Sequence, residues 1–127
     1  MDKKFKKYSV NITNDSTQPA AQAMLHAIGL TRKELDQPFI GIASTGYEGN
    51  PCNMHLNDLS KEIKDSLQKE ALTPLIFNTI GVSDGISMGT SGMRYSLPSR
   101  DIIADSMETV VGAVSYTHLR AHETPRY

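Results

Sequence analysis

Two short apolar runs on either side of an amphipathic helical pattern constrain the fold of this sequence most strongly. Residues 39–44 and 73–78 are continuous apolar runs of the kind found in strands covered on both faces, as in a parallel sheet. Between them, residues 54–71 repeat apolar side chains at spacings of three and four, namely Leu56, Leu59, Ile63 and Leu67. This order of elements predicts an α/β domain with short buried, parallel strands flanked by helices.

A further helix and a capped turn are expected before this unit. Residues 20–28 have high helix propensity, with Pro19 suited to a first helical turn and Gly29 to a C-terminal stop. Thr31 and Glu34 have the spacing of a capping box, which predicts a second, short helix directly before the first strand.

The remaining segments divide the chain into three parts. Residues 1–17 are polar and are expected to form an irregular arm, and residues 18–113 are expected to form the domain itself. The domain should end in a helix that opens near Ser96, with a proline in its first turn. Its apolar stripe is expected to consist of Ile103, Met107, Val110, Val111 and Val114.

Residues 114–127 lack any core pattern, and residues 114–124 match the conceptual translation of a transposase sequencing adapter. We therefore expect this tail to be non-native, with the natural sequence departing from it after about Ala113. His118 and His122 have the i, i+4 spacing of a metal pair on a helix. The adapter interpretation is preferred, and under it the two histidines have no role.

Composition limits the classes of protein to consider. The 127 residues suffice for one domain, and 39% hydrophobic with 21% charged residues is typical of a globular chain. The net charge of −1 gives no reason to expect a nucleic-acid or membrane partner, and no run approaches the ~18 apolar residues of a membrane span. Residues 1–7 are basic, but the apolar segment that a secretory signal requires does not follow them. A single cysteine excludes a disulfide framework. A cytoplasmic location is expected.

The only cysteine, Cys52, lies in a Gly/Pro/Asn-rich loop directly after the first predicted strand. In open α/β sheets the carboxyl ends of the strands are where sites are usually built. Asn53 is a plausible N-cap for the following helix, and the dipole of that helix would favour a thiolate. Three roles remain open on this reasoning: a buried structural cysteine, a nucleophile paired with His55, or a metal ligand whose partners lie elsewhere.

The loop after the second predicted strand, residues 79–95, contains four glycines and several hydroxyl side chains, with Asp84 between Ser83 and Gly85. Such a loop lets backbone approach a ligand closely and presents N–H groups to anions. It matches neither common nucleotide-binding fingerprint. A structural loop and a ligand loop remain equally open interpretations.

Three blocks, residues 49–56, 77–89 and 92–100, give the sequence a specific resemblance to the iron–sulfur dehydratase family that acts on dihydroxy acids and sugar acids. The resemblance extends from about Thr17 to Ala113. It implies a hydro-lyase that removes water from a 2,3-dihydroxy carboxylate, giving an enol that tautomerises to a 2-keto acid. The Ser-Leu-Pro-Ser-Arg block and residues 86–89 favour the dihydroxy-acid branch, in valine and isoleucine synthesis, over the sugar-acid and phosphogluconate branches.

The resemblance also implies cofactors, ligands and partners. Cys52 matches the first of three cysteines that hold an iron–sulfur cluster, 2Fe–2S or 4Fe–4S, and Asp84 matches a ligand of Mg²⁺. The substrate would be a small dihydroxy acid, and the full-length enzyme a homodimer.

The departures from the family pattern matter as much as the matches. The family's second cysteine in a Cys-Asp-Lys segment, its third cysteine, its other acidic ligands and its serine base have no counterpart in this sequence. No catalytic residue is therefore assigned here, and we expect an inactive, aggregation-prone portion of the enzyme. The alternative from another class is a small, non-enzymatic binding module that uses the glycine-rich loop.

Overall fold

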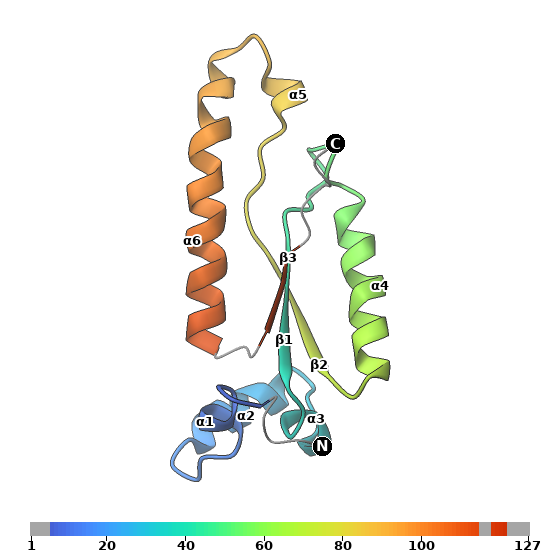
Figure 1. Cartoon of the computed structure of the whole chain (residues 1–127), viewed down its shortest axis with the longest axis vertical. Helices are drawn as coiled ribbons and strands as arrows, with labels where there is room; N and C mark the ends of the chain where they lie inside the picture. The colour runs from blue at the N-terminus through green and yellow to red at the C-terminus, as the bar shows by residue number, and fades with distance from the viewer. Residues whose placement is uncertain (1–5, 115–117, 122–127) are drawn as a thin grey trace.

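The computed structural model describes residues 6–114 and 118–121 (Figure 1). The elements follow in the order α1 (Val10–Thr13), α2 (Pro19–Ala27), α3 (Arg32–Leu35), β1 (Phe39–Ser44), α4 (Leu56–Lys69), β2 (Thr73–Asn78), α5 (Asp84–Ser87), the 3₁₀ helix η2 (Ser91–Tyr95), α6 (Ser96–Val114) and β3 (His118–Ala121). Both predicted strands and the three predicted longer helices are present.

The sheet has the strand order β2-β1-β3, and both pairings are parallel. In the β1–β2 pair, Phe39 lies opposite Thr73 and Ser44 opposite Asn78, so the two strands end level with each other. Every residue of the central strand β1 is buried. The continuous apolar run of β1 thus reflects cover on both faces, and the prediction of an α/β fold is confirmed.

The strands lie between α4 on one side and α6 on the other (Figure 1). Leu35 and Phe39 form the centre of the core and have no exposed surface. The partly buried side chains packed against them are Leu25, Leu30, Leu75, Phe77, Val110 and Val111. The core therefore lies where α3 leads into β1, and the second half of α6 closes over it.

The expected capping box is present at the start of α3. The Glu34 N–H donates to Thr31 Oγ1 at 3.3 Å, and the Thr31 N–H donates to Glu34 Oε2 at 2.7 Å. The hydrogen bonds from the Thr31 hydroxyl and backbone N–H hold the pKa of the Glu34 carboxyl below its ordinary value. Gly29, just after α2, has a φ of +93°, which explains why glycine stands at this turn.

The N-terminal segment is more ordered than predicted. Within the expected irregular arm, residues 10–13 form the one-turn helix α1, and Ser9 and Thr13 are fully buried. Lys6 Nζ donates to the carbonyl of Leu35, which fastens this segment to the end of α3. Burial lowers the pKa of the Lys6 ammonium. The Thr13 hydroxyl donates to the Ser9 carbonyl at 3.0 Å, whereas the buried Ser9 hydroxyl has no partner among the described residues. The polar composition of this segment gave no signal of its packing.

One strand lies in the tail. Residues 118–121, which have no core pattern in the sequence, form β3 and pair with β1 from Ile40 opposite His118 to Ala43 opposite Ala121. His118 lies in a strand, and His122 lies outside the described residues. A strand edge offers backbone N–H and C=O groups to any extended segment, so this pairing needs no particular side chains. The adapter interpretation of the tail stays a prediction.

Candidate functional site

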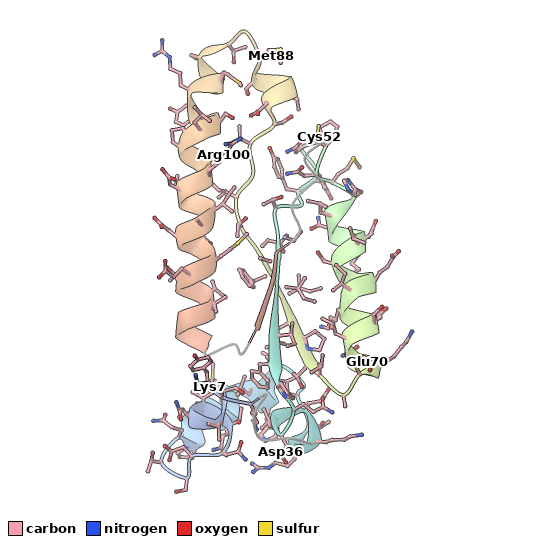
Figure 2. All side chains as sticks on the ribbon, in the orientation of Figure 1. Lys7, Asp36, Cys52, Glu70, Met88 and Arg100 are labelled. Atoms are coloured by element: carbon pink, nitrogen blue, oxygen red, sulfur yellow. The ribbon has the colours of Figure 1, made fainter. Side chains whose placement is uncertain are left out.

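The predicted site residues lie at the carboxyl end of the sheet. Cys52 is in the connection from β1 to α4, and Asp84 is the first residue of α5, which follows β2. Figure 2 shows Cys52 and Met88, beside α5, toward one end of the molecule and Lys7 and Asp36 toward the other. The structure thus brings the two loops singled out in the sequence to the same end.

Cys52 is exposed and its thiol is free. The default interpretation of a buried structural cysteine is therefore wrong for the chain as described. An exposed thiol on a loop at a sheet end is available to a ligand or to another polypeptide segment. This leaves the nucleophile and the metal ligand as the roles that the geometry permits.

Asn50 organises the turn that carries Cys52. Its side-chain Oδ1 accepts the backbone N–H of Cys52 at 3.1 Å, the arrangement of an Asx turn. Its carbonyl oxygen accepts the N–H groups of Asn53 and Met54, both at 2.9 Å. Asn50 is only 1% exposed. A buried residue therefore holds an exposed thiol in a fixed backbone conformation.

The start of α4 differs from the sequence prediction. His55, not Asn53, is the N-cap, without a side-chain capping bond, and α4 begins at Leu56, four residues after Cys52. The Asn53 amide instead donates to Thr45 Oγ1 at 3.1 Å, across the loop. The helix thus begins two residues later than predicted, and its N-terminal end is further from Cys52 than expected.

Hydrogen bonds also connect the loop after β1 to the end of β2. Asn78 Nδ2 donates to the Gly46 carbonyl and to Asn57 Oδ1, each at 3.2 Å. The Thr79 N–H donates to the Ser44 carbonyl at 2.9 Å. Hydrogen bonds therefore hold the two strand ends and the start of α4 together.

Gly81 brings the second loop against the first. A Cβ at this position would lie 3.0 Å from the Thr45 carbonyl oxygen and 3.4 Å from Asn53 Nδ2. A side chain would thus meet backbone that has little room to move. The glycine therefore permits a close approach of the two loops, as its place in a glycine-rich segment suggested.

Asp84 opens the one-turn helix α5 and is exposed. Ser83, which precedes it, caps this turn by accepting the Ile86 N–H at 3.4 Å. The carboxylate therefore has a defined backbone support but is open to solvent. Residues 79–95, expected to form a loop, contain this short helix and η2, so the segment is more regular than predicted.

The donor types fit the implied cofactors, but the described part of the chain does not complete either ligand set. A thiolate suits an iron–sulfur cluster, and a carboxylate suits Mg²⁺. Within residues 6–114 and 118–121, no group of three or more His, Cys, Asp and Glu side chains is placed to hold a metal ion. Cys52 and Asp84 are each compatible with one ligand position in such a site.

A groove lies next to these loops, on the side of α4. Its volume is about 530 Å³, and its lining residues are Gly46, Tyr47, Glu48, Asn57, Lys61, Ile76 and Asn78. Neither Cys52 nor Asp84 lines it. Two asparagines that shape this end of the molecule, Asn50 and Asn78, were not predicted from the sequence, because amide side chains are common in loops for many reasons. The one available signal was the position of Asn78 at the last residue of a predicted strand.

Comparison with known proteins adds a family to this geometry. A family model described as dihydroxy-acid/6-phosphogluconate dehydratase N-terminal matches residues 37–118. The dihydroxy-acid dehydratase of Flavobacterium psychrophilum is 67% identical over 110 residues, which are 87% of this chain and 20% of that protein. The mitochondrial dihydroxy-acid dehydratase of Schizosaccharomyces pombe is 60% identical over 111 residues, which are 87% of this chain and 19% of that protein.

The fold and the loops define an α/β domain with a candidate site at the carboxyl end of a parallel sheet. The chain belongs to the dihydroxy-acid/6-phosphogluconate dehydratase N-terminal family. It spans about a fifth of the length of the curated relatives that it matches. In the described residues, no helix is long and apolar enough to cross a membrane.

Proposed function

We propose that this chain supplies the first cluster ligand and one magnesium ligand of a dihydroxy-acid dehydratase. The reaction is the removal of water from a 2,3-dihydroxy carboxylate, which gives a 2-keto acid of valine and isoleucine synthesis. The observation that carries the proposal is the exposed Cys52 thiol, held by a buried Asn50 at the carboxyl end of β1, in a chain 67% identical to an enzyme of that name.

Cys52 would bind one iron of the cluster through its sulfur. The thiol is already outside the packed part of the chain, so ligation would not require the core to open. The turn around it is fixed by the Asn50 side chain and carbonyl. When bound, the cluster supplies an iron that acts as a Lewis acid toward the leaving 3-hydroxyl.

Asp84 would bind Mg²⁺ through a carboxylate oxygen, the ligand that this hard cation prefers. Its exposed position lets the carboxylate reach an ion that other segments also hold. The Ser83 cap and the close contact of Gly81 with the first loop would fix Asp84 relative to Cys52. The carboxylate and 2-hydroxyl of the substrate are the groups that such an ion would orient.

A cluster held by three cysteines needs two more than this sequence contains. We therefore propose that the 127-residue chain neither assembles the cluster nor dehydrates the substrate by itself, and that the complete enzyme is a cytoplasmic homodimer. Substrates of the sugar-acid and phosphogluconate branches are the alternative within the family. The relatives from Flavobacterium psychrophilum and Schizosaccharomyces pombe both carry the name dihydroxy-acid dehydratase, which favours the dihydroxy acid.

The test is a chimera in which residues 1–113 replace the matching part of the Flavobacterium psychrophilum enzyme. We expect the anaerobically reconstituted chimera to dehydrate 2,3-dihydroxyisovalerate in preference to an aldonate or 6-phosphogluconate. We expect Cys52→Ser to lose this activity. A chimera that prefers an aldonate or 6-phosphogluconate would replace the proposed substrate, and an active Cys52→Ser chimera would remove the proposed ligand.

A further inference from the structure

We infer that Asn50 is a positioning residue that presents the Cys52 thiol to the cluster. The inference rests on the proposed function, because it concerns how the proposed ligand is held. The resemblance of the sequence assigns no role to Asn50. Its burial and its contacts set it apart from the rest of the loop.

Asn50 is the buried anchor of an otherwise exposed segment. Gly49, Pro51 and Cys52 are all exposed, whereas Asn50 is 1% exposed. Burial of an amide side chain is costly unless its polar atoms have partners. The Oδ1 atom meets this requirement through the Cys52 N–H at 3.1 Å. Through this bond the buried amide of Asn50 restrains the turn that leads to the thiol.

The backbone of Asn50 reinforces the same turn. Its N–H donates to the Tyr47 carbonyl at 3.3 Å, and its carbonyl accepts from Asn53 and Met54. The backbone hydrogen bonds of Asn50 thus connect it both to an earlier residue of the loop and to the residues that lead into α4. The Cys52 N–H lies between these anchor points, so the Asn50 side chain restrains the backbone from which the thiol projects.

Hydrogen bonds also connect the turn that carries Cys52 to the end of β1. Asn53, whose N–H bonds to Asn50, donates its amide to Thr45 Oγ1 at 3.1 Å. The orientation of Cys52 is therefore linked through Asn50 and Asn53 to the end of β1. A partner that orients a metal ligand commonly changes metal affinity by about 10- to 100-fold when it is removed.

The experiment compares Asn50 variants in the chimera described above. Asn50→Leu removes the acceptor at similar size, and Asn50→Asp keeps an oxygen at the same place. Asn11→Ala, at an exposed asparagine of α1, is the matched control. Two readouts are used. The first is hydrogen exchange of the Cys52 amide. The second is the state of the reconstituted cluster, measured by the rate at which a chelator removes its iron and by the electron paramagnetic resonance spectrum of its reduced form.

We expect Asn50→Leu to speed exchange at the Cys52 amide roughly tenfold, the effect of losing one hydrogen bond. We expect the same variant to lose iron to the chelator about 10-fold faster or more and to alter the spectrum. Asn50→Asp and Asn11→Ala should remain close to the unsubstituted chimera in both readouts.

The outcomes separate this inference from the proposed function. Faster amide exchange in Asn50→Leu with unchanged iron retention and spectrum would overturn the inference, since Asn50 would then be a purely structural residue. Asn50→Asp as impaired as Asn50→Leu would overturn it too, because the acceptor oxygen would not be what matters. A Cys52→Ser chimera that holds a full cluster would instead overturn the proposed function, and the inference with it.

Discussion

At the amino end of the sheet Leu35 and Phe39 have no exposed surface, whereas at the carboxyl end Cys52, Asp84 and several large apolar side chains are open to solvent. The first end is held by apolar packing, in which α2, α3, both main strands and α6 take part. The second end is held by hydrogen bonds that the Asn50 side chain accepts and the Asn53 and Asn78 side chains donate. Stability and the candidate site are therefore concentrated at opposite ends of the same strands.

The exposed side chains sharpen this contrast. Ile86, Met88, Tyr95 and Leu97, from α5 through the start of α6, are each more than 60% exposed. Exposed large apolar side chains promote association when they gather into a patch. These exposed side chains are a further reason to expect that the isolated chain aggregates.

The largest expected effect is at the amino end. Phe39→Ala should lower the free energy of unfolding by about 3–5 kcal/mol, because it removes a fully buried ring and leaves a cavity. Tyr95→Ala, at a ring that is 71% exposed, should change it by less than about 0.5 kcal/mol. Urea unfolding followed by circular dichroism measures both. Equal losses would contradict the division into a packed end and an open end.

Two glycine substitutions test how closely the loop after β1 packs against the start of α4 at the carboxyl end of the sheet. A Cβ on Gly46 would lie 2.5 Å from Asn57 Oδ1 and 3.0 Å from the Asn57 backbone nitrogen, so Gly46→Ala should cost about 1–3 kcal/mol of stability. Gly112→Ala, in α6 with open space around it, should stabilise by roughly 0.8–1 kcal/mol. The measurement is the midpoint of urea unfolding for each variant. A neutral Gly46→Ala would show that the loops are not held closely together.

The cap of α3 gives a smaller effect. Thr31→Ala should lower the free energy of unfolding by about 1 kcal/mol, because the Glu34 N–H loses its acceptor. Thr109→Ala, at an exposed threonine inside α6, should be neutral or slightly stabilising because alanine favours helix. Thermal unfolding compares the two variants, and a Thr109→Ala as damaging as Thr31→Ala would remove the capping interpretation.

The same cap predicts a weak pH dependence. The pKa of the Glu34 carboxyl is lowered in the folded chain, so its stabilisation is present above the ordinary glutamate value, roughly 4.3, and is lost as the pH falls through the lower folded value. Glu34→Gln can accept the same bonds without titrating. The stability advantage of the unsubstituted chain over Glu34→Gln should therefore shrink in acid. An advantage that grew with falling pH would contradict the assigned sign.

Local patterns were sufficient to predict most of the fold. The strands at residues 39–44 and 73–78 are marked by continuous apolar runs because both of their faces are covered, and the Thr31–Glu34 box depends on residues three apart. Residues 10–13 were missed because their buried positions are polar and depend on contacts with α3. Strand β3 was missed because edge pairing uses backbone groups that every sequence has.

The position of the candidate site could also be predicted, but its internal bonds could not. Asp84 and Cys52 follow the two strands in sequence, so the fold itself brings their loops to one end. Asn53 was predicted to cap α4 because a local bond is the usual choice for an asparagine before a helix. Its actual partner, Thr45, lies eight residues away, and only the folded loop brings the two together.

The role of Cys52 as a cluster ligand is tested most directly by the iron and sulfide content of the reconstituted chimera with Cys52 and with Cys52→Ser. We predict a full cluster per chain with Cys52 and none that survives purification with serine, while the 127-residue chain alone retains no cluster. A full cluster in the Cys52→Ser chimera would contradict the claim that the turn held by Asn50 carries a cluster ligand.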